Sequence, residues 1–150
     1  MMRKHCRAYI VVVLITLSLF SSVGANYEKQ LSAAVRLMTA EELKTKVSAN
    51  EPLVILDVRN SESYAGSDAK IKGAIHVSVR KLKYRLGFPP LKDVPKDRQV
   101  VTYCSCPSDE ASIKAAQVLM ESGFTNVRVL KGGWLEWQKA SGPTESRPRG

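Results

Sequence analysis

The sequence is poor in cysteine and histidine, with three cysteines and two histidines among its 150 residues. Three cysteines cannot build the set of disulfides that holds a small secreted scaffold together. Apart from one of each near the amino terminus, the soft metal donors are Cys104, Cys106 and His76, fewer than the roughly four ligands of a structural zinc site. The sequence therefore excludes a disulfide scaffold and predicts no metal site.

Long hydrophobic runs are also missing. The longest, Ala8 to Phe20, has 13 residues, whereas a membrane-spanning helix needs about 20. Three basic residues precede this run, and the small residues Val23, Gly24 and Ala25 follow it. This pattern predicts a secretory signal peptide over residues 1–25, with an uncleaved anchor as the alternative. We expect an exported protein, periplasmic or secreted, with no stable membrane span after cleavage.

The length leaves no room for a second domain, and no internal repeat occurs. The composition, 44% hydrophobic and 25% charged, is typical of one globular domain. Cleavage would remove three basic residues and no acidic ones, which lowers the formal net charge from +9 to +6. A moderate basic excess of this kind keeps a protein soluble, and no nucleic-acid partner is expected.

Three apolar runs predict buried strands: Leu53 to Leu56, Gln99 to Tyr103, and Val127 to Leu130. Their hydrophobic residues are continuous rather than alternating, which is typical of strands buried on both faces. Helical patterns separate them, and strands that alternate with helices indicate a parallel sheet. In such a sheet, ligands bind beyond the carboxyl ends of the strands. The loop at residues 104–108 follows one of those ends.

Two helix starts are recognisable. Thr39, with Glu42 three positions later, forms a capping box and predicts a helix that begins near Thr39. Ser108 is expected to cap a second helix, which Gly123 ends. A further group of basic residues, Arg80, Lys81, Lys83 and Arg85, is interpreted as a solvated helix face, with the steering of an anionic ligand toward the loop after Tyr103 as the alternative.

Several short motifs occur in a specific order and spacing. They are Thr39-Ala-Glu-Glu-Leu43, Leu56-Asp-Val-Arg59, Ile71-Lys-Gly-Ala-Ile75, Tyr103-Cys104, Gly123-Phe124, and Leu130-Lys-Gly-Gly-Trp134 followed by Trp137. Together they resemble the rhodanese domain family. The resemblance implies a single α/β domain over residues 37–141, with a mostly parallel central sheet flanked by helices. Residues 26–36 are then a lead-in segment, residues 142–150 a flexible tail, and the protein a monomer.

The resemblance implies a sulfurtransferase. In this family a cysteine takes sulfur from a sulfane-sulfur donor, holds it as a persulfide, and passes it to a thiol or another nucleophile. A helix amino terminus and backbone amides would stabilise the sulfur anion. The expected partners are a small sulfur donor and a thiol acceptor, which is either a small molecule or a protein. No cofactor is expected.

The loop departs from the common family pattern Cys-x-x-Gly-x-Arg-Ser. Counting from Cys104 puts Pro107 in the place of the glycine and Asp109 in the place of the arginine. The loop is then anionic where it is usually cationic, which argues against thiosulfate as the donor. Counting back from Ser112 would instead make Cys106 the family cysteine. The Tyr-Cys ending of the strand favours Cys104.

We therefore expect Cys104 to carry the persulfide and Cys106 to act as a second thiol. Backbone amides of residues 105–109 are expected to surround the anion. The expected substrate-binding residues are Ser105, Pro107, Ser108, Asp109 and Glu110, and the supporting residues are Asp57, Arg59 and Ser112. Two alternatives remain: a thiol-disulfide redox protein that uses the two cysteines, and a rhodanese-like binding module without catalysis.

Overall fold

The computed structural model of this protein describes residues 35–148. The signal peptide expected over residues 1–25 lies outside the described residues, as does most of the lead-in segment. Within the described part of the chain, no helix is both long and apolar enough to cross a membrane.

A five-stranded parallel sheet forms the centre of the domain, in the order β1-β6-β5-β2-β4. Its strands are β1 (Arg36–Met38), β2 (Val54–Asp57), β4 (Ile75–His76), β5 (Val100–Tyr103) and β6 (Val127–Leu130). All four residues of β5 are buried. Each of the three predicted apolar runs therefore forms a strand, and the predicted α/β fold with a mostly parallel sheet is confirmed.

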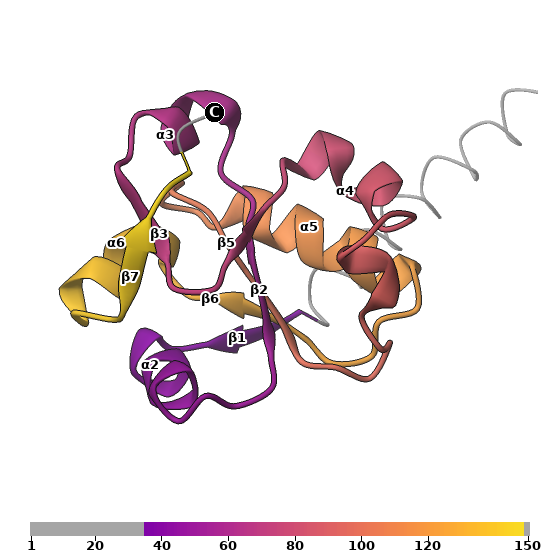
Figure 1. Ribbon diagram of the computed structural model, residues 1–150, viewed down its shortest axis with the longest axis horizontal. Coiled ribbons are helices and arrows are strands. Elements are labelled where there is room, and N and C mark those ends of the chain that lie inside the picture. Colours follow the sequence, from indigo (N-terminus) through magenta and orange to yellow (C-terminus); the bar gives the residue numbers. More distant parts are fainter. Residues whose placement is uncertain (1–34, 149–150) are drawn as a thin grey trace, which may run out of the picture. The chain divides into compact units, whose positions relative to one another are not determined.

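Helices cover both faces of this sheet. They are α2 (Ala40–Ser48), α3 (Ser61–Ala65), α4 (Val79–Arg85), the 3-10 turn η1 (Leu91–Asp93), α5 (Glu110–Glu121) and α6 (Gly133–Lys139). Figure 1 shows α2 and α6 on the opposite side of the sheet from α5. Side chains of α4 and α5 pack in one apolar cluster, and side chains of α2 and α6 pack in the other.

Alternation along the strands supplies both clusters. In β5, Val100 belongs to the cluster under α5, whereas Val101 and Tyr103 belong to the cluster under α6. A strand sends successive side chains to opposite faces, so a continuous apolar run is needed where both faces are covered.

The first helix begins where the sequence predicts. The Thr39 side chain accepts a hydrogen bond from the Glu42 amide at 3.2 Å, which satisfies one of the amides that a helix leaves free at its start. Leu43, on the predicted apolar stripe, is fully buried.

The prediction that Ser108 caps α5 was wrong. Ser108 is exposed, and the residue before the helix is Asp109, with a φ of 54° in the left-handed region. The Asp109 side chain makes no capping bond because it is bonded elsewhere, to the turn before α6. The end of the helix agrees with the sequence: Ser122 is its last cap residue, and Gly123 follows with a φ of 89°.

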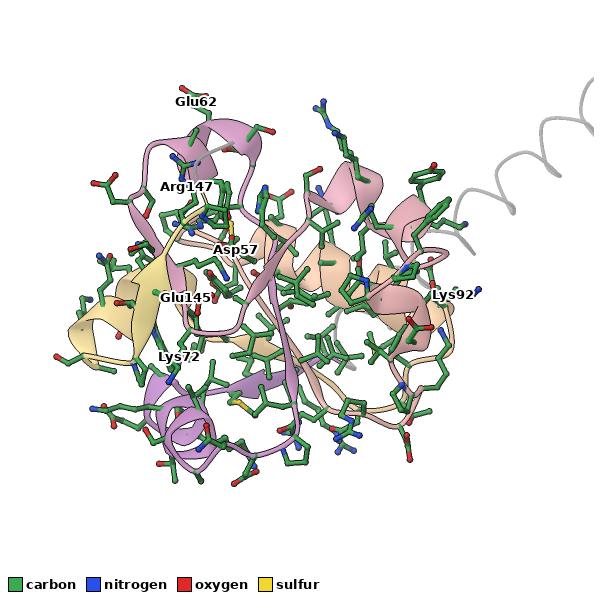
Figure 2. All side chains as sticks on the ribbon, viewed as in Figure 1. Asp57, Glu62, Lys72, Lys92, Glu145 and Arg147 are labelled. Carbon is green, nitrogen blue, oxygen red and sulfur yellow. A yellow bond between two sulfur atoms is a disulfide. The ribbon has the colours of Figure 1, made fainter. Side chains whose placement is uncertain are left out.

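The flexible tail expected over residues 142–150 contains a strand. β7 (Thr144–Ser146) pairs antiparallel with β3 (Ala69–Ile71). Glu145 of β7 forms an ion pair with the buried Lys70, and Arg147 donates hydrogen bonds to carbonyls beside α3, where Figure 2 shows it. The segment lacks an apolar face, and polar contacts hold it to the domain instead.

Candidate active site

Cys104 stands directly after β5, at the carboxyl edge of the sheet. It is 2% exposed and packs in the cluster under α5. Its sulfur forms a disulfide with Cys106, with the two Cα atoms 5.7 Å apart. Cys106 is half-buried, and the intervening Ser105 is exposed. The two cysteines that the sequence singles out therefore share one site.

The loop after Cys104 is fixed at both ends by the turn that opens α6. The Trp134 amide donates to the Cys104 carbonyl at 2.8 Å, and the Gly132 amide donates to Asp109 Oδ2 at 2.8 Å. Gly133 has a φ of 50°, and a β-carbon there would collide with the Cys104 carbonyl. The sequence marks this Lys-Gly-Gly-Trp motif as a family feature, but its part in holding the cysteine loop comes from the structure.

Asp109 consequently does not point at the sulfur. Asp109 is only 8% exposed. Together with Pro107 it lines a separate hollow beside α2 and α6. The carboxylate that makes the loop formally anionic thus supports the loop's shape. Asp109 is therefore no longer an argument against an anionic sulfur donor such as thiosulfate.

The pocket over the cysteines is open and has a volume of about 660 Å³. Three segments line it: residues 58–63 after β2, residues 78–81 at the start of α4, and residues 104–106 together with Ala111. Arg80 and Lys81, which the sequence suggests lie on a solvated face, both line this pocket. Glu62 adds a negative charge to the lining.

Only Ser105, of the five expected substrate-binding residues, lines the pocket with the cysteines. Pro107 and Asp109 line the other hollow. Ser108 is exposed, and Glu110 pairs with Lys114 at 2.7 Å on the surface of α5, where the hydrogen bond from Lys114 lowers the pKa of Glu110.

The start of α5 faces the cysteines. A helix leaves its first amides without intrahelical acceptors and carries a partial positive charge at that end. Here these amides belong to Glu110, Ala111 and Ser112, and Ala111 itself lines the pocket. Ser112 is fully buried, and its carbonyl accepts a hydrogen bond from Thr102 at 3.0 Å. That bond ties the helix start to β5.

Below the pocket lies a buried ion pair between Asp57 and Arg59. Arg59 Nη2 lies 2.6 Å from Asp57 Oδ2, and the two side chains are 1% and 0% exposed. Tyr103 donates its hydroxyl to the same carboxylate oxygen at 2.6 Å. Arg59 also donates to the Ala69 carbonyl at 3.1 Å, so the pair connects β2, β3 and β5. Figure 2 shows Asp57 in the interior of the domain.

The surroundings keep the Arg59 side chain charged and the Tyr103 hydroxyl neutral. Burial acts to lower the pKa of Arg59, but the hydrogen bond and the negative charge of Asp57 outweigh it and raise the pKa. Burial raises the pKa of Tyr103, and the charge of Asp57 raises it further, so the hydroxyl remains a donor. The Arg59 guanidinium also lies over the Trp134 ring at 4.9 Å and the Tyr64 ring at 5.3 Å. These contacts join α3 and α6 beneath the pocket.

His76 gives the stability of the domain a predictable pH dependence. Burial lowers its pKa below the ordinary 6.5, although the charge of Asp57 opposes this shift and those of Arg59 and Arg147 add to it. Its ring stacks on Tyr64 at 3.6 Å. The unfolded chain therefore binds a proton near pH 6.5 while the folded chain does not. The free energy of unfolding should fall as the pH drops below 6.5, and the loss should stop below the folded pKa.

Denaturant unfolding of the wild type and of His76→Gln, at about pH 7.5 and about pH 5.5, would measure this effect. We expect the wild type to lose more stability over that interval than the variant, because the variant has no imidazole to protonate. Equal losses in both proteins would show that other groups cause the pH dependence.

Asp109 offers a test of its structural role. Asp109→Ala should lower the free energy of unfolding by about 1–3 kcal/mol, because the Gly132 amide loses a buried acceptor. Asp109→Asn should stay within about 1 kcal/mol of the wild type, because asparagine tolerates the left-handed conformation and its oxygen can accept the same bond. Urea unfolding of the two variants measures the difference. If Asp109→Asn lost as much as Asp109→Ala, the charge rather than the hydrogen bond would stabilise the loop.

The comparisons with known proteins agree with this fold. A model of the rhodanese-like domain family matches residues 39–140. The chain therefore belongs to the rhodanese-like domain family.

Relatives of this chain are named for sulfur transfer. It is 36% identical over 92 residues to the thiosulfate sulfurtransferase GlpE of Coxiella burnetii, an alignment that covers 61% of this chain and 77% of that protein. It is 28% identical over 105 residues to a sulfurtransferase of Allochromatium vinosum, covering 70% of this chain and 90% of that protein. The crystal structure of the Alr3790 protein from Anabaena sp. superimposes with a TM-score of 0.62 at 31% identity, covering 73% and 82% of the two chains. The family is thus associated with sulfur transfer in general.

Proposed function

We propose that this protein is a sulfurtransferase that carries sulfur as a persulfide on Cys104. The observation that supports this most directly is the position of Cys104 at the end of β5, beneath an open pocket and before the amino terminus of α5. Helix amides and the helix dipole stabilise a sulfur anion in that position. The working form needs both cysteines reduced, since the disulfide leaves neither as a thiolate.

In the first step the Cys104 thiolate attacks the sulfane sulfur of a donor. One sulfur–sulfur bond forms, and the bond within the donor breaks, so the rest of the donor leaves as an anion. In the second step an acceptor thiolate attacks the outer sulfur of the persulfide. Cys104 leaves as a thiolate, and the donor sulfur has moved to the acceptor.

The charge around the pocket favours an anionic donor. Arg80 and Lys81 line it, whereas Asp109 is bonded to Gly132 on the other side of the loop. A persulfide or polysulfide anion fits these charges as well as thiosulfate does. The family arginine beside the sulfur is absent from this loop, so we expect the less highly charged persulfide donors to react faster than thiosulfate.

Intact mass spectrometry tests the proposal. Reduced protein is incubated with glutathione persulfide or with thiosulfate and separated from the donor, and its intact mass is then measured. We expect Cys106→Ser to gain one sulfur atom and Cys104→Ser to gain none, with Ser48→Ala, on the exposed surface of α2, as a control that keeps both thiols. Sulfur on Cys104→Ser alone would make Cys106 the carrier. If no variant gained sulfur from either donor, the sulfurtransferase proposal would fall and a binding module without catalysis would replace it.

A second function is favoured by the Cys104–Cys106 disulfide itself. Two cysteines that can pair within one loop can cycle between dithiol and disulfide, as a thiol-disulfide redox protein does. Titration of free thiols after mild oxidation would test this. A redox protein should lose both thiols rapidly and regain both with a dithiol reductant, with no dependence on a sulfur donor.

We also propose that the protein is exported and that the sequence over residues 1–25 is its signal peptide. The basic start, the short apolar run and the small residues before Asn26 support this. Amino-terminal sequencing of the protein from a native envelope or secreted fraction would test it. A chain that begins at Asn26 is the expected result, and an intact amino terminus would contradict cleavage.

A further inference from the structure

Cys106 lies where it can act on whatever Cys104 carries. The two residues are separated by Ser105 alone, both line the same pocket, and the loop allows their sulfur atoms to bond with the Cα atoms 5.7 Å apart. An acceptor thiol for the Cys104 sulfur is thus part of the same loop. In most two-component transfers the acceptor must diffuse in from solution.

We propose that Cys106 reduces the persulfide on Cys104, so that the protein releases the sulfur as hydrosulfide and ends as the Cys104–Cys106 disulfide. This inference rests on the proposed persulfide chemistry at Cys104. It names hydrosulfide as the product, Cys106 as the group that attacks the persulfide, and the Cys104–Cys106 disulfide as the form in which the protein ends the reaction.

The step balances within the protein. The Cys106 thiolate attacks the inner sulfur of the protonated persulfide, which is Cys104 Sγ, and the outer sulfur keeps its proton. The Cys104 to Cys106 bond forms, the bond to the outer sulfur breaks, and the outer sulfur leaves with its electron pair as hydrosulfide. The sulfane sulfur is reduced, and the two cysteine thiols are oxidised to one disulfide.

The structure holds the two cysteines in the arrangement that this attack produces. The Asp109 amide donates to the Cys106 carbonyl at 3.2 Å and closes a turn, while the Trp134 amide holds the Cys104 carbonyl at 2.8 Å. Both ends of the short segment are therefore fixed with the cysteines facing each other. The turn is closed with the disulfide in place, so the product of the attack fits the loop in this conformation.

The disulfide must be reduced again before the next reaction, and the burial of the two cysteines determines which of them the reductant attacks first. Cys104 is 2% exposed, whereas Cys106 is half-buried. An external dithiol can therefore reach Cys106 more easily, form a mixed disulfide there, and release Cys104 as the thiolate at the start of α5. The second thiol of the reductant then frees Cys106. We expect the reductant to be a dithiol, because one dithiol molecule supplies both thiols that the reduction of the disulfide consumes.

Attack on the persulfide by Cys106 should be faster than attack by a thiol in solution. Two groups joined by a short flexible segment have an effective concentration of about millimolar. At about 10 µM of external thiol, the internal reaction is then favoured about 100-fold. The protein would release hydrosulfide under those conditions even if a small thiol were present.

A single-turnover experiment tests this. Fully reduced protein receives an equimolar amount of glutathione persulfide, and released sulfide and protein mass are followed together. We expect the wild type to release one hydrosulfide per chain and to finish with a disulfide, about 100-fold faster than Cys106→Ser releases sulfide. Cys106→Ser should retain the added sulfur. Ser48→Ala, on the exposed surface of α2 and outside the pocket, keeps both thiols and should behave as the wild type does.

The glutathione formed from the donor is present in all samples, so Cys106→Ser measures the background from an external thiol. Retention of the persulfide by the wild type, or equal release from wild type and Cys106→Ser, would overturn the inference and leave the carrier function intact. Failure of Cys106→Ser to gain any sulfur would instead overturn the carrier function, and this inference with it.

Discussion

Arg59→Met is expected to lower the free energy of unfolding by about 3–5 kcal/mol. The substitution keeps a long apolar side chain but leaves Asp57, which is fully buried, without its positive partner. Arg59 donates to both oxygens of that carboxylate, at 2.6 to 3.0 Å. An unpaired buried charge costs far more than an exposed one, because the interior cannot solvate it.

Denaturant unfolding of Arg59→Met against the wild type measures this loss. The matched control is Lys139→Met, which removes a lysine from its pair with Glu136 on the surface of α6, where the two side chains are 61% and 43% exposed. Exposed pairs of that kind contribute about 0–1 kcal/mol. A loss for Arg59→Met no larger than that for Lys139→Met would mean that the interior ion pair contributes little, and that solvent reaches Asp57.

Gly133→Ala is expected to lower the free energy of unfolding by about 2–5 kcal/mol, from backbone strain and from the collision that follows. The residue has a φ of 50°, and its new β-carbon would meet the backbone carbonyl of Cys104. The collision must move Cys104 or the start of α6. Because the cysteine has to meet its donor in a defined geometry, we also expect sulfur uptake to slow by about 100-fold.

Gly123→Ala is a control that separates the effect of backbone strain from the effect of the collision with Cys104. Gly123 also has a positive φ, 89°, but a β-carbon there meets nothing within 4 Å. It should therefore show the strain alone, about 1–3 kcal/mol, with sulfur uptake unchanged in the folded protein. Denaturant unfolding and the mass-based uptake assay apply to both variants. A slow uptake in Gly123→Ala, or a normal rate in Gly133→Ala, would contradict the role assigned to the contact with Cys104.

Three of the strands, β2, β5 and β6, and the first helix were predictable because short-range patterns determine them. The continuous apolar runs that become β2, β5 and β6 are needed wherever helices cover both faces of a sheet. Thr39 caps α2 through an amide only three residues away. Such signals lie within a few positions of one another in the sequence.

The site was predictable in part. The position of Cys104 after β5 followed from the strand pattern, and Cys106 and Ser105 share its pocket. The orientation of Asp109 was not predictable, since the amide that holds its carboxylate belongs to Gly132, 23 positions further along the chain. Arg80 and Lys81 were likewise assigned to a solvated face, because nothing local indicates that α4 begins at the wall of the pocket.

The strand β7 has a practical consequence for where this domain ends. The family match stops at residue 140, so a recombinant fragment cut to that boundary would omit β7. β3 would then have a free edge, and the buried Lys70 would lose the carboxylate of Glu145. Unpaired edges invite association between chains. Fragments for expression should therefore extend through Arg147, and affinity tags at this end need a spacer beyond it.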